Sequence, residues 1–194
     1  PFVLYCKPNS KEMIGFFQRN DTLFQVADFN EKGFVLSSFD GEKNYLIPEN
    51  ESEVLKFTLD KKESRVSLNE FTVVDLVAKS NFEALVAKGI QCIKNYEFNK
   101  VLLSRKETVA LADFDLLSAF EKLVQLYPST FVYCFYHPKI GTWLGATPEQ
   151  LLKANDTVFE TISLAGTQKD MGSSEIIWEK KEKEEQQFVT DYIV

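Results

Sequence analysis

The sequence predicts an α+β fold in which most strands pair antiparallel. Three observations support this class: the first third of the chain contains only strand-like runs, the hairpin signal Asp40-Gly41 joins two of them, and helices begin only after about residue 70. A repeated strand-helix-strand unit would alternate from the start, so a parallel sheet is disfavoured. With 194 residues, 44% hydrophobic and 26% charged, we expect residues 1–194 to form a single domain.

Residues 1–70 are expected to form a strand-rich scaffold. The predicted strands are the β-rich runs 2–7, 23–29, 33–39 and 45–47. The segment 49–70 is polar and charged, which is typical of an exposed edge or a long loop. Because no reactive group stands out here, the function is expected to lie in residues 71–194.

Residues 71–194 alternate helices with strands. A capping box of Ser80 and Glu83 predicts a helix that continues to about Lys94. Two more helices are predicted, an amphipathic one that ends at Pro128 and one from about Glu175 onward. The predicted strands are 99–111, 130–136 and 140–146, followed by a hairpin through Asn155-Asp156.

The charge and residue counts exclude several classes of function. A net charge of −7 disfavours nucleic acids and anionic membranes as partners. No apolar stretch is long enough to span a bilayer and no signal peptide is recognisable, so we expect a cytoplasmic protein. Three separated cysteines and the single His137, in a predicted turn, exclude a disulfide framework, a zinc cluster and a histidine-based triad. The cysteines are expected to be buried or half-buried thiols.

Lys100 begins the apolar run 100–105 (KVLLSR). Period two places Lys100 on one face of a strand with Leu102 and Ser104, and both faces of that strand are expected to be covered. A lysine that loses solvation there is more easily neutral and can act as a general base. The alternative is an ordinary strand-end lysine whose ammonium group reaches water.

Two turns of small residues are further candidates. In 145–149 (GATPE) a tight bend can aim the carboxyl group of Glu149 into a cleft, although a solvated turn glutamate is equally compatible with the pattern. In 163–167 (SLAGT) a glycine among small residues lets the backbone approach a ligand closely. The Thr167 hydroxyl and backbone N–H groups could donate to an anion there.

Glu185 is predicted to lie on the apolar stripe of the last helix, with Glu182 at its edge. The stripe consists of Trp178, Glu185, Phe188, Val189 and Tyr192. A carboxylate on a buried face requires a counter-charge, and Mg²⁺ is a suitable hard cation. A salt bridge to a lysine or arginine would satisfy the same requirement.

Taken in order, the segments 100–105, 145–149, 164–167 and the Glu185 helix resemble four successive motifs of the chorismate-utilising enzymes. The resemblance covers about residues 70–194. It implies that family's α+β fold, with large antiparallel sheets stacked and helices outside. It also implies that this chain is the N-terminal portion of the family's domain, and that the piece alone is inactive. A second metal glutamate and the carboxylate-binding residues would then lie beyond residue 194.

Within the family, the chain is most similar to isochorismate synthase. Members that add water to chorismate carry lysine at the position of Lys100, whereas amine-adding members typically carry glutamine. Aminodeoxychorismate synthases typically place a nucleophilic lysine where this chain has Ala165. The resemblance therefore implies water as the nucleophile, in an isochorismate synthase or its relative salicylate synthase.

The resemblance also implies roles for the candidate residues. Lys100 would be the general base, Glu149 the general acid and Glu185 a ligand of Mg²⁺. The residues implied to bind the substrate are Ala165, Gly166 and Thr167. A non-catalytic chorismate-binding domain is an alternative function. The product of the enzyme could serve menaquinone or siderophore biosynthesis. The charge pattern permits a monomer.

Overall fold

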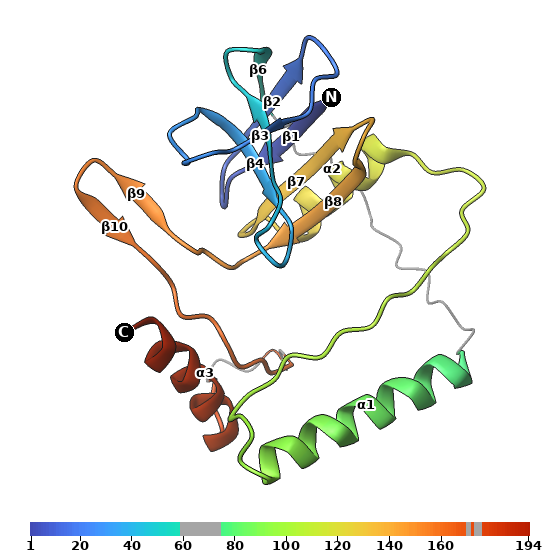
Figure 1. Ribbon diagram of the computed structural model, residues 1–194, viewed down its shortest axis with the longest axis vertical. Coiled ribbons are helices and arrows are strands. Elements are labelled where there is room, and N and C mark those ends of the chain that lie inside the picture. Colours follow the sequence, from blue (N-terminus) through green and yellow to red (C-terminus); the bar gives the residue numbers. More distant parts are fainter. Residues whose placement is uncertain (59–74, 170–171, 173–175) are drawn as a thin grey trace. The chain divides into compact units, whose positions relative to one another are not determined.

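The computed structural model describes residues 1–58, 75–169, 172 and 176–194 (Figure 1). The chain divides into two compact units. Unit 1 consists of Pro1–Val66 and Asp113–Pro148, and unit 2 of Ser67–Ala112 and Glu149–Val194. The units interleave in sequence, because the first segment of unit 2 is inserted within unit 1. The expectation of a single domain stays a prediction.

Unit 1 is built on a five-stranded antiparallel sheet with the order β6-β2-β1-β7-β8. Its strands are β1 (Phe2–Cys6), β2 (Glu12–Gln18), β6 (Ser52–Thr58), β7 (Phe131–His137) and β8 (Gly141–Thr147). Phe2 pairs with Phe17 on one side and with Tyr136 on the other. The first strand of the chain is therefore the middle strand of this sheet.

A second sheet of unit 1 has the order β3-β5-β4. Its strands are β3 (Phe24–Gln25), β4 (Gly33–Ser37) and β5 (Asn44–Pro48). The predicted hairpin at Asp40-Gly41 is confirmed: Gly41 has φ +74°, its N–H donates to the Ser38 carbonyl at 3.0 Å, and Ser37 pairs with Asn44. Glycine reaches this left-handed conformation without steric cost.

The core of unit 1 lies on both faces of the five-stranded sheet. Side chains alternate along β1, so that Val3 packs with Phe135 and, from β5, Ile47, whereas Cys6 faces the other way. There it packs with Phe120 of α2 (Leu116–Leu126), a fully buried side chain. Unit 1 thus has three layers: the three-stranded sheet, the five-stranded sheet and helix α2. This arrangement confirms the predicted α+β class with antiparallel pairing and an outer helix.

The three cysteines and the single histidine are buried or half-buried. Cys6 and Cys134 are buried free thiols and Cys92 is half-buried, as predicted. Burial raises the pKa of the Cys6 thiol to about 11. His137 is also buried, at the predicted turn between β7 and β8, where Ile140 N donates to its carbonyl at 3.0 Å.

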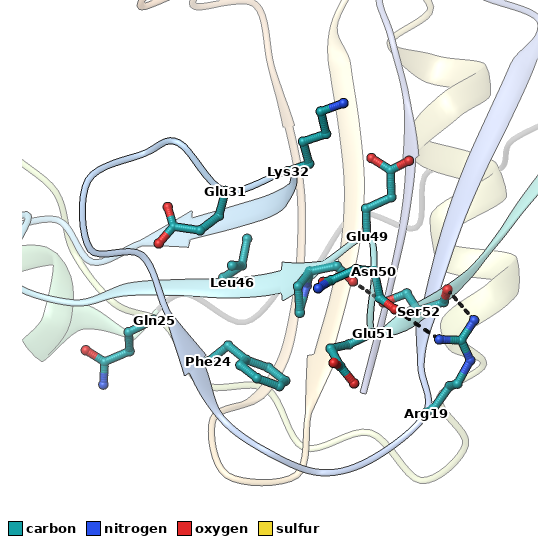
Figure 2. Close-up of a pocket in the computed structure, with 11 residues that line it drawn as sticks. Arg19, Phe24, Gln25, Glu31, Lys32, Leu46, Glu49, Asn50, Glu51 and Ser52 are labelled. Atoms are coloured by element: carbon teal, nitrogen blue, oxygen red, sulfur yellow. Dashed lines mark hydrogen bonds between the residues drawn. The ribbon is translucent and has the colours of Figure 1, made fainter.

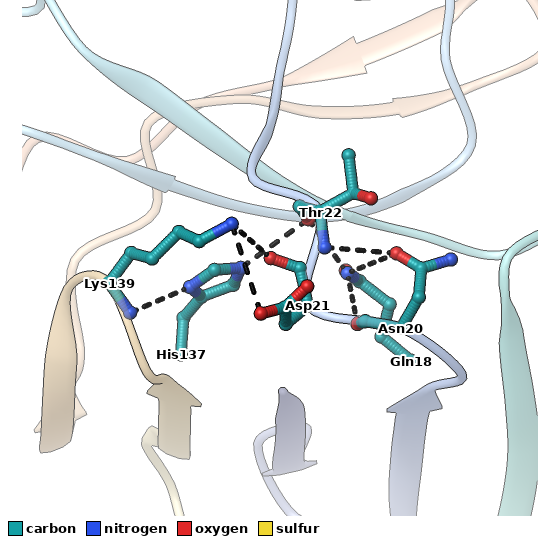
Figure 3. A network of polar contacts seen from close by, with 6 residues as sticks. All are labelled: Gln18, Asn20, Asp21, Thr22, His137 and Lys139. Atoms are coloured by element: carbon teal, nitrogen blue, oxygen red, sulfur yellow. Dashed lines mark hydrogen bonds and ion pairs between the residues drawn. The ribbon is translucent and has the colours of Figure 1, made fainter.

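The His137 ring links that turn to the loop after β2 (Figure 3). The backbone N–H of Lys139 donates to Nδ1 at 3.1 Å, and Nε2 lies 3.4 Å from the Thr22 carbonyl oxygen. Lys139 Nζ reaches the Asp21 carbonyl at 2.8 Å. Desolvation by burial lowers the pKa of His137, which favours the neutral form of the ring.

The described residues of unit 2 form two helices and one small hairpin. These are α1 (Leu76–Lys94), α3 (Lys180–Ile193), β9 (Lys153–Asn155) and β10 (Val158–Glu160). The hairpin turns at Asn155-Asp156 as predicted, and Asp156 has φ +51°. Helix α1 begins before the predicted Ser80, because the Asp75 side chain accepts hydrogen bonds from Val77 N and Ala78 N.

Two strand predictions need correction. The run 99–111 forms no strand, since an apolar run becomes one only by pairing and this segment has no strand partner among the described residues. The run 23–29 shortens to β3, because residues 27–29 form a bend in which Phe29 has φ +61°. Strand β2 was not predicted, and β6 occupies the sheet edge expected in 49–70.

No helix of the described chain has the length and apolar character needed to cross a membrane.

Candidate functional site

Every site residue predicted from the sequence lies in unit 2, and the structure brings two of them into contact. Lys100 Nζ lies 3.3 Å from Glu185 Oε1, although the two residues are 85 positions apart in the chain. The side chain of Lys100 is 23% exposed and that of Glu185 is 35% exposed. A partly desolvated ammonium and carboxylate therefore face each other at the centre of the candidate site.

Glu185 lies on the partly buried face of helix α3, and most residues of that face are polar. The partly buried positions of the helix are Glu182, Glu185, Gln186, Val189 and Thr190. Their spacing is that of one helical face. The predicted stripe is correct for Glu185 and Val189 but wrong for its three aromatic members, Trp178, Phe188 and Tyr192, which are exposed. The buried face is rotated towards Gln186 and Thr190, which an apolar pattern does not detect.

Glu182 is a more enclosed carboxylate than Glu185. Its side chain is only 15% exposed, and its Oε2 is buried with no hydrogen-bond partner among the described residues. Lys181 Nζ lies 4.0 Å from Oε1, at the limit of an ion pair. Residues three apart on a helix are neighbours, so Glu182 and Glu185 share this face of α3.

The carboxylate oxygens of Glu182 and Glu185 are donors of the kind that a hard divalent cation prefers. Mg²⁺ is typically held by one or two protein carboxylates, with substrate and water as the other ligands. Glu182 and Glu185 supply oxygen donors of the right chemistry, and the orphaned Oε2 of Glu182 is an acceptor that a cation or its water can use. Among the described residues, no group of three or more His, Cys, Asp or Glu forms a closed metal cage.

Gly166 brings the segment 163–167 against α3. Its φ is +81°, and a Cβ at this position would lie 2.9 Å from the backbone oxygen of Glu182. Only glycine allows this approach, because no real Cβ sits so close to a backbone oxygen. The expected close approach of backbone at Gly166 is thus realised, with the helix as its partner.

A pocket of about 360 Å³ lies beside this contact. It is lined by Ser163, Leu164, Ala165, Trp178, Glu182, Lys183, Gln186 and Gln187. Thr167 is exposed just beyond this lining. The pocket therefore combines a small-residue wall from one segment with carboxylate, amine and amide groups from α3.

Glu149 lies exposed in the segment that follows β8. The next residue, Gln150, donates to Glu160 Oε1 at 3.0 Å and so ties this segment to β10. The exposed position agrees with the solvated alternative for Glu149. Its role as a general acid stays a prediction.

Sequence reasoning did not find the hydrogen bonds that surround Gln186. Gln186 Nε2 donates to Ser163 Oγ at 3.2 Å and to Thr190 Oγ1 at 3.0 Å. The only sequence signal was three polar residues with no assigned role. These bonds link α3 to the segment that carries Ala165 and Gly166.

A larger pocket lies in unit 1, with a volume of about 810 Å³ (Figure 2). Its most obvious anion-binding group is Arg19, but the guanidinium donates to the backbone carbonyls of Asn50 at 3.1 Å and Ser52 at 3.0 Å. The Arg19 side chain therefore stabilises the turn before β6. These contacts agree with the scaffold role predicted for residues 1–70.

The comparisons with known proteins point to one family. A family described as "Chorismate binding enzyme" matches residues 37–194, a range that includes the whole of the described site. The comparisons with curated proteins and with solved structures found no match. Because the match covers most of the chain, this protein belongs to the family of chorismate-binding enzymes.

Proposed function

We propose that this protein takes part in the conversion of chorismate to isochorismate. The observation that carries the proposal is the contact between Lys100 and Glu185, which places an amine beside the carboxylate expected to hold the cation. The resemblance adds the choice of nucleophile, since lysine at position 100 and alanine at position 165 are typical of members that use water. The reaction adds water at C2 of chorismate and expels the C4 hydroxyl with migration of a double bond.

Mg²⁺ would be held by Glu185, with the orphaned carboxylate oxygen of Glu182 as a second acceptor. When bound, the ion would neutralise a substrate carboxylate and fix its position. Ala165 in the pocket wall, with Gly166 and Thr167 next to it, would orient the ring. The pocket beside α3 would hold the flat substrate.

Proton transfer is assigned to Lys100 and Glu149. Water is a poor nucleophile and hydroxide a poor leaving group, so a base and an acid are both needed. Lys100 would accept a proton at Nζ from the attacking water, for which its ammonium first has to leave the ion pair with Glu185 and release its own proton to solvent. Glu149 would donate a proton to the departing C4 oxygen. Each transfer is worth about 10²–10⁴ in rate.

The test is a turnover assay on the intact protein with chorismate and Mg²⁺. Lys100→Ala and Glu149→Gln should each lower kcat at least about 10²-fold. The exposed Lys180, which pairs with Glu184 on the same helix, offers Lys180→Ala as a matched control with an unchanged rate. Near-normal rates in the two site variants would remove these roles.

Product analysis separates the alternatives. A stable pool of isochorismate supports the proposal, whereas salicylate with pyruvate would identify a salicylate synthase. Calorimetry adds the third case, because binding of chorismate without any product would identify a non-catalytic binding domain.

A further inference from the structure

A closed set of hydrogen bonds joins α3 to the segment before Gly166. Gln186 Nε2 donates to both Ser163 Oγ and Thr190 Oγ1. Thr190 Oγ1 donates in turn to Ser163 Oγ at 3.0 Å, and Ser163 Oγ donates to the Gln186 carbonyl at 3.4 Å. Each hydroxyl therefore both donates and accepts. We call these three side chains the docking cluster.

The polar side chains of the docking cluster indicate a specific contact between α3 and the segment before Gly166. Its three side chains are partly buried, and polar groups in such a position are costly unless they are bonded. Neighbouring Gln187 is different, because it is exposed and bonds to Asp191 one turn along the same helix. Gln187 stabilises α3 itself, whereas Gln186 links it to another part of the chain.

The position of the docking cluster determines what it controls. The backbone of Glu182 is held against Gly166, and Gln186 and Thr190 are held against Ser163. Glu185 lies between these two attachments. A helix fixed at both points can neither rotate about its axis nor slide, so the direction of the Glu185 side chain towards Lys100 is set by the docking cluster.

We propose that Gln186, acting with Ser163 and Thr190, is a positioning residue that holds Glu185 in register with Lys100 and with the cation. It touches neither group itself and acts through the orientation of α3. The role of Glu185 in cation binding rests on the proposed function, whereas its alignment with Lys100 does not.

The experiment measures the Lys100–Glu185 pair directly. A double-mutant cycle with Lys100→Met and Glu185→Gln gives the coupling of the pair in the unfolding equilibrium of the intact protein, without substrate. It is run in three backgrounds: wild type, Gln186→Met and Gln187→Met. We expect a coupling of about threefold to fivefold in wild type and in Gln187→Met, falling to about onefold in Gln186→Met.

Two further readouts separate positioning from general stability. The dissociation constant of Mn²⁺, used as a probe for the cation, is measured in the Lys100→Met background, where no ammonium competes for Glu185; it should rise about tenfold with Gln186→Met and stay unchanged with Gln187→Met. Thr190→Val removes the hydroxyl without changing the side-chain shape and should act like Gln186→Met, whereas Thr190→Ser should restore both values. Thr190→Val also replaces Gln186→Met if that variant does not fold.

The outcomes are distinct. Unchanged coupling in both Gln186→Met and Thr190→Val overturns the proposal, as does an equal loss of coupling in Gln187→Met. Failure of the wild-type protein to convert chorismate would refute the proposed function, and the cycle would still decide the positioning role.

Discussion

Replacement of Gly166 by alanine tests the approach between the segment 163–167 and α3. Two costs add at this position. The left-handed φ of +81° costs an L-residue about 1–2 kcal/mol. The new Cβ would also lie 2.9 Å from the Glu182 backbone oxygen, which cannot rotate away, so the helix has to shift at a cost of about 1–3 kcal/mol. We expect a total loss of about 2–5 kcal/mol.

A matched variant isolates the second cost. Gly41 has nearly the same φ, +74°, but a Cβ there would meet nothing within 4 Å. Gly41→Ala should therefore lose only about 1–2 kcal/mol. The free energy of unfolding from urea titrations measures both. Equal losses in the two variants would show that Gly166 does not pack against α3, and the argument for a helix held at two points would fail.

Three further results are expected. Phe120→Ala should lower the free energy of unfolding by about 3–5 kcal/mol, because this fully buried ring packs under the five-stranded sheet. Leu117 is exposed, so Leu117→Ala should change the free energy of unfolding little in the same urea titrations. Burial lowers the pKa of His137 in the folded state below the value of about 6.5 that an unfolded histidine has, so its contribution to stability is complete above that pH and is lost as the pH falls towards the lowered pKa. A His137→Gln variant should lack this part of the pH dependence, and identical stability profiles of the two proteins between pH 8 and 5 would contradict it. Lys100→Met removes the ammonium that competes with a cation for Glu185, so the Mn²⁺ dissociation constant should fall about tenfold in calorimetry; an equal fall in the surface variant Lys180→Met would indicate a general charge effect.

Local signals in the sequence predicted local structure well. The Asp40-Gly41 turn and the hairpin at Asn155-Asp156 are each determined by a few neighbouring residues. The strand expected at 99–111 was wrong because a strand depends on a partner elsewhere in the chain, which composition cannot identify.

The candidate site was predicted only in part, because its contacts also join distant parts of the chain. Glu185 was placed correctly on the inward face of α3, and a salt bridge was one of the two counter-charges considered for it. The partner Lys100 could not be assigned, because their contact spans 85 positions. Gln186 and Thr190 were missed because a search for apolar periodicity treats amide and hydroxyl side chains as solvent-facing.

The central place of β1 in its sheet has a consequence for biosynthesis. Phe2 is synthesised well before Tyr136, its neighbour in the sheet, because the two residues lie far apart in the sequence. At about 5–20 residues per second, β1 and β2 wait several seconds with one open edge. That unpaired edge is a template for association between nascent chains, so a chaperone that covers it should raise the yield of folded protein. Circular permutation that brings β7 next to β1 should remove this delay.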